Sequence, residues 1–484
     1  MKKITTFIIA ILGIFGMASA QGDYEAFTFS QSDYYGTARF MGAGGAFGAT
    51  GGDFSALSTN PASIGLYKRH ETSITPLGLS FGYTDTYYNG RLSSAQKVKY
   101  NFPQAGMVLS NSIKLNNNWK SWQFGFGFNR IMDFNNTFRA NAEVNSSLSD
   151  MVLSHIEDGT YPGNLNGDFK LFWDASIIDT FPGSNNQYYS RFSNARIAQK
   201  ASVVKSGAIN EMVLSFGGNY NDQLYIGATL GFPFLDFKET STYTEFPADS
   251  QDLYGIQDYT LYSTQRNTGT GVNLKLGILY QPADFVRLGV SFHTPTYYWK
   301  IKDRFYRELS TRYAPYTNIP DYISSYETYN TFALTTPLKV NVSTSFLIKK
   351  RAFIAAEYEF QNYNMAIMND DHYDYSITNE TIRAKYGPSH SVRVGAEVNV
   401  TQGFALRAGY RFKSSPYKMS DSPYNNTTHF ISAGFGFRGE HFFTDFAYVY
   451  RMNKDSYWLF DPVGEPCDIY SKTHNVVATI GFKI

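Results

Sequence analysis

The chain has 484 residues, a net charge of +1 and a single cysteine, Cys467. The near-neutral charge gives no indication of nucleic-acid binding, and one cysteine excludes both an intrachain disulfide and a cysteine-based metal cluster. Aromatic side chains make up 17% of the residues. This is roughly double the usual share, and membrane β-barrels use such an excess for lipid contact and for interface girdles. The length suits one large barrel with its loops.

The first 20 residues have the pattern of a secretory signal peptide. Lys2 and Lys3 form a charged start, residues 4–17 are apolar, and residues 18–20 (Ala-Ser-Ala) provide a small-residue cleavage site. The apolar stretch is shorter than the ~20 residues that a membrane-spanning helix needs. The mature chain is therefore predicted to begin at Gln21, and the absence of a cysteine after this site argues against lipid anchoring.

The next segment, residues 21–69, lacks a strand pattern and contains short glycine-rich runs. Residues 38–47 are Ala-Arg-Phe-Met-Gly-Ala-Gly-Gly-Ala-Phe, an Asp/Ser stretch covers residues 53–57, and the tripeptide Asn60-Pro61-Ala62 follows. The glycines do not form a nucleotide-binding loop, because the third glycine of that motif is missing and no βαβ unit surrounds them. The segment is long enough to form a small plug inside a barrel.

From residue 70 to the end, apolar side chains occur at every second position in runs of about ten residues. Barrel strands face lipid and lumen alternately, so this period of two is typical of an outer-membrane β-barrel. The runs, fourteen in all, lie at residues 75–83, 105–113, 122–128, 212–220, 224–232, 272–280, 286–292, 340–348, 354–360, 392–400, 406–410, 431–437, 442–450 and 476–484. An even number of strands returns both termini to the periplasm.

The longest connection covers residues 133–208 and is predicted to be an extracellular loop. Within it, apolar residues recur at helical spacing at Val144, Leu148, Met151, Val152 and Ile156. Residues 169–178 form a second candidate helix. We expect these amphipathic helices to cap the barrel mouth or to form a binding surface.

The order of signal peptide, plug segment and fourteen strands, with Asn60-Pro61-Ala62 directly before the first strand, resembles the FadL/TodX family of outer-membrane transporters. The resemblance covers the mature chain in architecture and residues 38–66 in motif. It implies an all-β fold, a 14-stranded antiparallel transmembrane barrel over residues 70–484 with an N-terminal hatch over residues 21–69. It also implies a monomer in the outer membrane of a Gram-negative bacterium, in contact with membrane lipid.

The resemblance further implies a mechanism. A hydrophobic small molecule, either a long-chain fatty acid or an aromatic hydrocarbon, is caught at the outer loops and enters a pocket in the lumen. A rearrangement of the hatch then lets it leave sideways through the barrel wall, where the third strand kinks inward. No cofactor and no metal are expected, and no enzymatic activity.

Few site residues carry over from the resemblance. Asn60, Pro61 and Ala62 match the hatch motif, in which Asn60 either hydrogen-bonds the hatch to the wall or ends a helix in a turn. Gly125 and Gly127 lie in the third strand and are the candidates for its kink. The alternative for both glycines is close packing of neighbouring aromatic rings, a common use of glycine in strands.

Charged residues in three neighbouring strands share the parity that faces the lumen. A Lys or Arg on the lipid face at mid-membrane costs roughly 2–4 kcal/mol, so the inward parity avoids that cost. Two roles fit them: an anchor for a carboxylate headgroup, which Arg binds bidentately, or a salt-bridge ladder that stiffens the wall or holds the hatch. The candidates are Glu357, Glu359, Arg393, Glu397, Arg407 and Arg411.

Two other functions also fit the sequence. A FadL-like barrel can serve as a protein-interacting scaffold in secretion or surface assembly, with its extracellular loops docking a protein partner. An outer-membrane lipid hydrolase needs a nucleophile beside a base, and His390 and His429 are the candidate bases, although no triad is recognisable around them. Transport is the leading hypothesis, because a hatch is superfluous in an enzyme whose site faces lipid.

Overall fold

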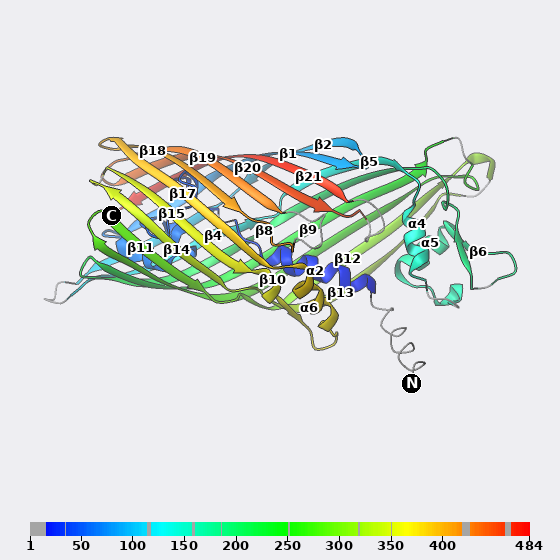
Figure 1. Cartoon of the computed structure of the whole chain (residues 1–484), viewed down its shortest axis with the longest axis horizontal. Coiled ribbons are helices and arrows are strands. Elements are labelled where there is room, and N and C mark those ends of the chain that lie inside the picture. Colours follow the sequence, from blue (N-terminus) through cyan, green and yellow to red (C-terminus); the bar gives the residue numbers. More distant parts are fainter. Residues whose placement is uncertain are drawn as a thin grey trace.

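The computed structural model describes residues 16–33, 35–113, 118–156, 160–184, 186–249, 252–317, 320–349, 351–418, 426–459 and 466–484, with side chains from Gly22 onward. The charged start of the predicted signal peptide lies outside these described residues. The chain forms a long, tilted β-barrel with short turns at one end and long loops at the other (Figure 1).

Strands dominate the described chain. They are β1 (Glu71–Tyr88), β2 (Arg91–Asn101), β3 (Gln104–Ser112), β4 (Trp119–Asp133), β5 (Asn136–Val144), β6 (Ile178–Thr180), β7 (Tyr188–Ser190), β8 (Ile197–Tyr220), β9 (Leu224–Pro247), β10 (Ile256–Ala283), β11 (Val286–His293), β12 (Tyr297–Tyr313), β13 (Tyr322–Thr335), β14 (Lys339–Ile348), β15 (Ala352–Asn362), β16 (Ile367–Asn369), β17 (Pro388–Thr401), β18 (Phe404–Lys413), β19 (Thr427–Arg438), β20 (Phe442–Tyr457) and β21 (Cys467–Lys483).

Helices are short and lie in the lumen or in the loops. The α-helices are α2 (Gly16–Ser30), α3 (Ala38–Gly42), α4 (Leu148–Ser154), α5 (Gly167–Asp174) and α6 (Ser376–Lys385). The 3-10 helices are η2 (Phe54–Ser58), η3 (Pro61–Leu66), η4 (Pro162–Asn164), η5 (Pro315–Thr317) and η6 (Tyr363–Met365). Among the described residues, none of these helices has the length and apolarity that crossing a membrane requires.

The barrel is closed, antiparallel and 14-stranded, which confirms the predicted fold. Several positions in the wall consist of two consecutive strands separated by a short break: β2 with β3, β4 with β5, β11 with β12, β13 with β14, and β15 with β16. The last strand pairs with the first, from Glu71↔Lys483 to Tyr87↔Asp468. The wall therefore begins and ends at the same barrel end, as an even strand number requires.

The predicted alternation of faces is confirmed along the wall. In β10, Leu274 and Leu276 are 39% and 45% exposed on the outer face, whereas Lys275 between them is 4% exposed. In β17, Val392 and Val394 are exposed and Arg393 is 1% exposed. The apolar side chains therefore meet lipid, and the charges point into the lumen.

The predicted loop at residues 133–208 is shorter than expected. β5 pairs with the first part of β8, from Asn136↔Lys205 to Val144↔Ile197, so the loop proper covers only residues 145–196. The sequence of these strand ends does not alternate between apolar and polar residues, because they project beyond the membrane. Polar residues such as Lys200 face outward there. The two predicted helices are confirmed as α4 and α5.

The N-terminal segment lies inside the barrel. Figure 1 shows the C-terminus at the short-turn end of the barrel. α2, with which the described residues begin, lies farther toward the loop end. α2 runs through the predicted cleavage site, and its remainder packs against α6 and β16. α3, η2 and η3 contact the wall near the short turns, which places a plug where the sequence predicts the hatch.

Candidate functional site

Side-chain caps define the short helices of the hatch. The Thr37 hydroxyl accepts a hydrogen bond from Phe40 N and donates to Asp53 Oδ2 at 2.7 Å. Asp53 in turn caps η2 by accepting from Ser55 N at 3.0 Å. Burial raises the pKa of the Asp53 carboxyl, against the opposing effect of Arg39 and of these hydrogen bonds. The caps of α3 and η2 are thus joined into one polar unit.

The Asn60-Pro61-Ala62 turn seats the hatch on the wall. Asn60 Oδ1 accepts from Ala62 N at 3.1 Å, and Pro61 begins η3, so the turn is a helix cap. Asn60 Nδ2 donates to Gly48 O at 2.7 Å and to Ile278 O of β10 at 3.4 Å. Asn60 therefore bonds the hatch to the wall, and it caps the start of η3 rather than ending a helix.

Glycines on the inner face of the wall make room for this turn. A Cβ atom at Gly227 of β9 would lie 2.4 Å from Pro61 O, and one at Gly277 of β10 would lie 2.0 Å from Asn60 Oδ1. Both separations are far inside van der Waals contact. The backbone of the hatch therefore approaches the wall as closely as it does only because these positions lack side chains.

Gly125 and Gly127 of β4 also face the hatch. The register of β4 with β3 and with β8 runs unbroken past both positions. A Cβ atom at Gly125 would lie 3.0 Å from Ile64 Cδ1, and one at Gly127 would lie 2.5 Å from the ring of Phe54. Both positions are closely packed: aliphatic side chains of the hatch lie over Gly125, and Gly127 meets both the Phe54 ring of the hatch and the backbone of β3.

The discontinuity in the third strand lies farther along than these two glycines. The register of β4 with β8 shifts between Arg130 and Met132, and β4 ends shortly afterwards. Gly207 of β8 has a φ of +106°, and its carbonyl accepts from Phe134 N at 3.1 Å. Glycine takes this backbone conformation at little cost. The register shift of this strand therefore lies beyond Gly125 and Gly127, between Arg130 and Met132.

Beyond this discontinuity, side chains rather than a strand ladder hold β2 next to β5. Arg130 Nη1 donates to Asn101 Oδ1 at 2.7 Å, and Asn141 Nδ2 donates to Ser93 Oγ at 3.2 Å. In the described part of the chain, β2 pairs only with β1 and β5 only with β8. This seam is thus a part of the described wall in which neighbouring strands have no backbone pairing.

Buried ion pairs join β15 to β17, and one of their carboxylates also binds the hatch. Arg393 Nη1 lies 2.5 Å from Glu357 Oε1, and its Nη2 lies 2.8 Å from Glu359 Oε2. Glu357 also accepts a hydrogen bond from the hatch, from Gly48 N at 2.9 Å. Removing one partner of such a buried group leaves a charge uncompensated, so the pairs depend on one another.

A second set of ion pairs fastens α3 to β17, β18 and β20. Arg39 of the hatch donates to both carboxylate oxygens of Glu397, at 2.8 and 2.9 Å. Arg407 lies 2.6 Å from the same carboxylate and 2.7 Å from Asp445 Oδ1. Both Arg407 and Asp445 have side chains that are 0% exposed. Glu397 is thus shared between hatch and wall.

The third contact joins Asp33 to β18 and β20, farther along the same two strands. Arg411 Nη2 lies 3.4 Å from Asp33 Oδ1 and donates to Ser32 O at 3.2 Å, while Arg451 lies 3.3 Å from Asp33 Oδ2. All six lumen candidates from the sequence are therefore buried and engaged by the protein itself. This arrangement corresponds to the salt-bridge ladder that holds the hatch.

The outer half of the lumen contains a cavity of about 640 Å³. α2 closes it toward the hatch, α4 and α5 cover it on the loop side, and β8, β9, β10, β12 and β13 form its wall. Its apolar lining includes Leu148, Met151, Val152, Phe172, Val203 and Leu261. A chamber of this size between the loop helices and the hatch is a candidate binding site.

Charged pairs tie the elements around this cavity together. Asp168 of α5 forms an ion pair with Arg307 of β12 and accepts from the Tyr326 hydroxyl at 2.8 Å. On the hatch side, Lys385 of α6 lies 2.9 Å from Asp23 of α2. The cap and the floor of the cavity are therefore each anchored by an ion pair, and the wall between them carries both apolar and polar side chains.

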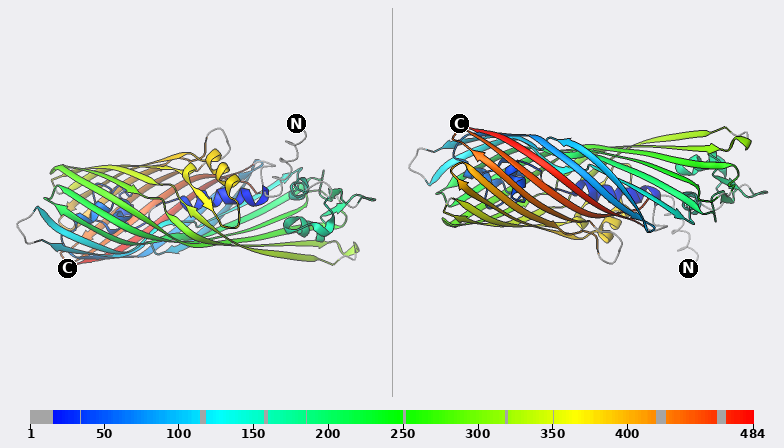
Figure 2. Two further views of the ribbon diagram at one scale, coloured as in Figure 1. Left: turned by 90° about the horizontal axis from the view of Figure 1, so that it is seen from below. Right: turned by 90° about the horizontal axis from the view of Figure 1, so that it is seen from above.

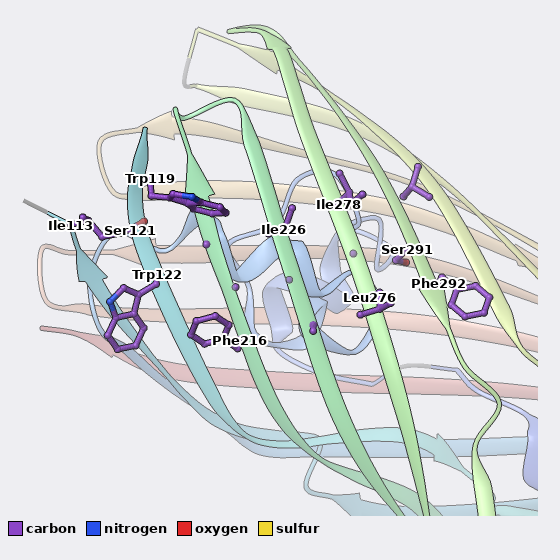
Figure 3. Close-up of a pocket in the computed structure, with 16 residues that line it drawn as sticks. Ile113, Trp119, Ser121, Trp122, Phe216, Ile226, Leu276, Ile278, Ser291 and Phe292 are labelled. Atoms are coloured by element: carbon purple, nitrogen blue, oxygen red, sulfur yellow. The ribbon is translucent and has the colours of Figure 1, made fainter. Parts of the chain in front are cut away.

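A second hollow, of about 840 Å³, lies on the outer face near the short turns. Figure 3 shows Trp122, Phe216, Ile278 and Phe292 on the side of the strands opposite to the hatch. Gly218 lines the same hollow, where larger neighbours surround a position without a side chain. This surface faces lipid, so acyl chains occupy it in the membrane.

Three exposed histidines pair with tyrosines across neighbouring strands. The Nδ1 atoms lie 2.7, 2.9 and 2.6 Å from hydroxyls in the pairs His390–Tyr358, His429–Tyr410 and His474–Tyr448. Aromatic groups repeated at one level are typical of an interface girdle. Among the side-chain hydrogen bonds of the described residues, neither the His390 nor the His429 ring contacts a serine or a carboxylate, so the hydrolase alternative gains no triad.

The sequence profile of a family described as BamG matches residues 179–447, more than half of the chain. The chain belongs to the BamG family. No curated protein matches the sequence. The BamG family is an outer-membrane family, and with the barrel fold it assigns the protein to the outer membrane of a Gram-negative bacterium.

Solved transporter structures share this fold. A FadL homologue from Pseudomonas aeruginosa is 13% identical, with 93% of this chain and 98% of that chain covered and a TM-score of 0.54. The Pseudomonas putida toluene transporter TodX is 12% identical, with 93% and 99% covered and a TM-score of 0.52. The predicted resemblance to FadL/TodX is confirmed as a shared fold for this BamG-family chain.

Sequence reasoning missed the hatch residues that complete the charged contacts. Arg39 and Asp33 lie in a segment without periodicity, and Asp445 lies at a position between the apolar residues of the 442–450 run. A signal was present, because charged residues within a glycine-rich plug need partners when they are buried. Their partners follow from the fold, however, and not from the sequence spacing.

Proposed function

We propose that this BamG-family barrel transports hydrophobic small molecules passively across the outer membrane and binds them in the outer cavity. The cavity is the observation that carries the proposal. Its volume of about 640 Å³ falls within the range typical of ligand pockets, and its wall combines apolar side chains with many polar ones, among them Asp303 and Arg307. The fold shared with TodX, solved as a toluene transporter, supports the same role.

The cargo is a long-chain fatty acid or an aromatic hydrocarbon, and its exit is lateral. The segment around Asp33 and Tyr35 donates backbone hydrogen bonds to Ile131 O at 2.8 Å and Arg130 O at 2.9 Å, beside the β2–β5 seam. Withdrawal of this segment would free the β2–β5 seam, which lacks a strand ladder. Sideways exit suits apolar cargo, because the molecule avoids water.

A binding measurement on the purified full chain tests the proposal. The probe is a fluorescent fatty-acid analogue, displaced in a second titration by toluene. Met151→Trp fills the cavity from α4 and should weaken binding by about tenfold, equivalent to about 1.4 kcal/mol. His155→Trp alters an exposed position beside the same helix and should leave binding unchanged. Equal binding by both variants and the parent chain would contradict the proposed site.

A protein-binding scaffold is the second candidate function. The buried ion pairs that hold the hatch favour it, because a scaffold needs a rigid, sealed barrel and a transporter must release these contacts. Mass spectrometry of material that co-purifies after mild detergent extraction separates the two functions. A bound apolar small molecule that is lost in Met151→Trp supports transport, whereas a stoichiometric protein partner with an empty lumen supports the scaffold.

A further inference from the structure

One strand of the outer half has a free edge. β13 pairs with β12 along its length, from Tyr297↔Thr335 to Thr311↔Tyr322. On its other side, β16 pairs only with residues 333–335. Within the described chain, no strand pairs with residues 322–332 on that side. In both views of Figure 2 the β12–β13 hairpin projects at the barrel end that carries α4 and α5, beyond the ends of β17–β20.

This free edge lies outside the membrane. Tyr297 and Trp299 are exposed aromatic residues at the base of the hairpin, as expected at the membrane interface. Above them the outward residues of β12 are polar and include Lys302, Arg304 and Arg312. The unpaired edge of β13 therefore faces the aqueous medium at the cell surface.

The edge carries little of the usual protection against strand pairing, because Glu327 is its only charged residue between positions 322 and 332. Residues 322–332 include no proline, lysine or glycine, and their register with β12 has no shift between Tyr322 and Phe332. The strand is rich in Tyr and Thr, which favour extended structure, and Ile323 and Tyr329 are each 67% exposed. Natural edge strands are normally short, charged or bulged, because an open edge is a template for another strand.

We propose that the free edge of β13 receives an extended segment of a partner polypeptide at the cell surface as an added β-strand. The edge offers alternating backbone donors and acceptors, which match a peptide backbone and which neither lipid tails nor sugars reproduce in that spacing. β16 already uses the same edge over three residues, so the added strand continues an existing ladder. This inference is independent of ligand passage through the lumen.

The occupant is a different polypeptide rather than a second copy of this chain. Two β13 strands that pair in an antiparallel manner are related by a twofold axis perpendicular to the strands. In one membrane, that symmetry would place the two barrels in opposite orientations. A flexible segment of another protein has no such constraint and adds to the edge in either direction.

Site-specific photo-crosslinking in cells tests the proposal on the full chain. A photoreactive amino acid is placed at Ile323, Ser325 or Glu327, which lie two residues apart along β13. Matched controls carry it at Ser310 and Glu308 of β12, which face Ile323 and Ser325 one strand away from the edge. Tryptic mass spectrometry then locates each adduct on the captured chain.

Strand addition predicts a register. Moving the probe by two residues along β13 should move the adduct by two residues within one short segment of one partner, and the controls should give at least about tenfold less adduct because an extra strand separates them from the edge by roughly 4.8 Å. Ser324→Pro and Ser325→Pro remove N–H groups that point to opposite edges of β13. The variant that loses the N–H group on the free edge keeps its pairing with β12, so it should keep full heat stability and abolish the adducts. Scattered adducts, adducts to a second copy of this chain, or none from a folded barrel would each overturn the proposal.

Discussion

The two halves of the lumen are filled in different ways. In the half near the short turns, the hatch lies against glycines and is held by buried charges such as Arg393 and Arg407, with side chains at 1% and 0% exposure. In the outer half, helices cover a cavity of about 640 Å³, and the ion pair between Asp168 and Arg307 is only partly buried. The half near the short turns is therefore sealed by the hatch, and the outer half has room to bind a ligand.

This difference separates sealing from binding within one barrel. The seal depends on contacts that are far apart in sequence and buried, so single changes there should affect stability and ion leakage together. The cavity depends on a loop that is locally folded, so changes there should affect binding while the seal is kept. Each prediction below tests this separation, beginning with the largest expected effect.

Deletion of residues 21–69 should leave an inserted barrel with strongly raised ion conductance, because fourteen strands enclose more space than wall side chains fill. Replacement of residues 145–196 by a short Gly-Ser turn should remove the cavity cap without opening the seal. Single-channel recording in planar bilayers measures both variants. Unchanged conductance in the first, or an open channel in the second, would contradict the assignment of the seal to the hatch.

Asp445→Asn should destabilise the barrel by about 3–5 kcal/mol, because it leaves buried Arg407 short of compensating charge. Urea unfolding in detergent micelles measures the free energy. Asp236→Asn is the matched control in the outer half, since its ion pair with Arg266 is more than half exposed and should contribute nothing measurable. Similar losses in both variants would remove the distinction between the halves.

Gly277→Ala should displace the hatch, because the added Cβ atom would lie 2.0 Å from Asn60 Oδ1. Overpacking of this kind costs about 1–3 kcal/mol, and we expect a partial rise in conductance. Gly82→Ala serves as control, because its nearest neighbour would be Lys97 O at 3.5 Å. The prediction fails if the two alanine variants have the same unfolding free energy and the same conductance.

Asn60→Ala should have the smallest effect, about 1 kcal/mol, which is typical of losing a helix cap. It also removes the hydrogen bonds to Gly48 O and Ile278 O. The unfolding midpoint in urea should fall, while binding of the fatty-acid probe in the outer cavity should not change. A selective loss of probe binding would show that the hatch turn shapes the binding site directly.

The sequence predicted the parts of this structure that repeat and failed where they stop repeating. Alternation placed Lys275 and Arg393 inside because lipid penalises charge at every second position. It could not place the discontinuity of the third strand, which depends on a positive φ at Gly207 of a different strand. The predicted strands also ended too early at the loop end, because the parts of the strands above the membrane have no apolar face to mark them.

The charged contacts illustrate the same limit. Their inward parity was readable, and so was the alternative that they hold the hatch. The match of Arg39 with Glu397 was not readable, because it joins residues 358 apart in the chain. Such partners are set by where the hatch lies, and the hatch has no periodicity from which its position could be read.

The hatch contacts the last strand of the barrel directly. Ala38 N donates to Thr479 Oγ1 at 2.7 Å, across 441 residues, and Thr479 also lies 2.8 Å from the Thr75 hydroxyl of the first strand. The seam between β1 and β21 is therefore covered from within by the hatch. Contacts of such high order form late in folding. The hatch must already be threaded into the nascent cylinder when its last strand arrives, so the same step that ends insertion also locks the plug in place.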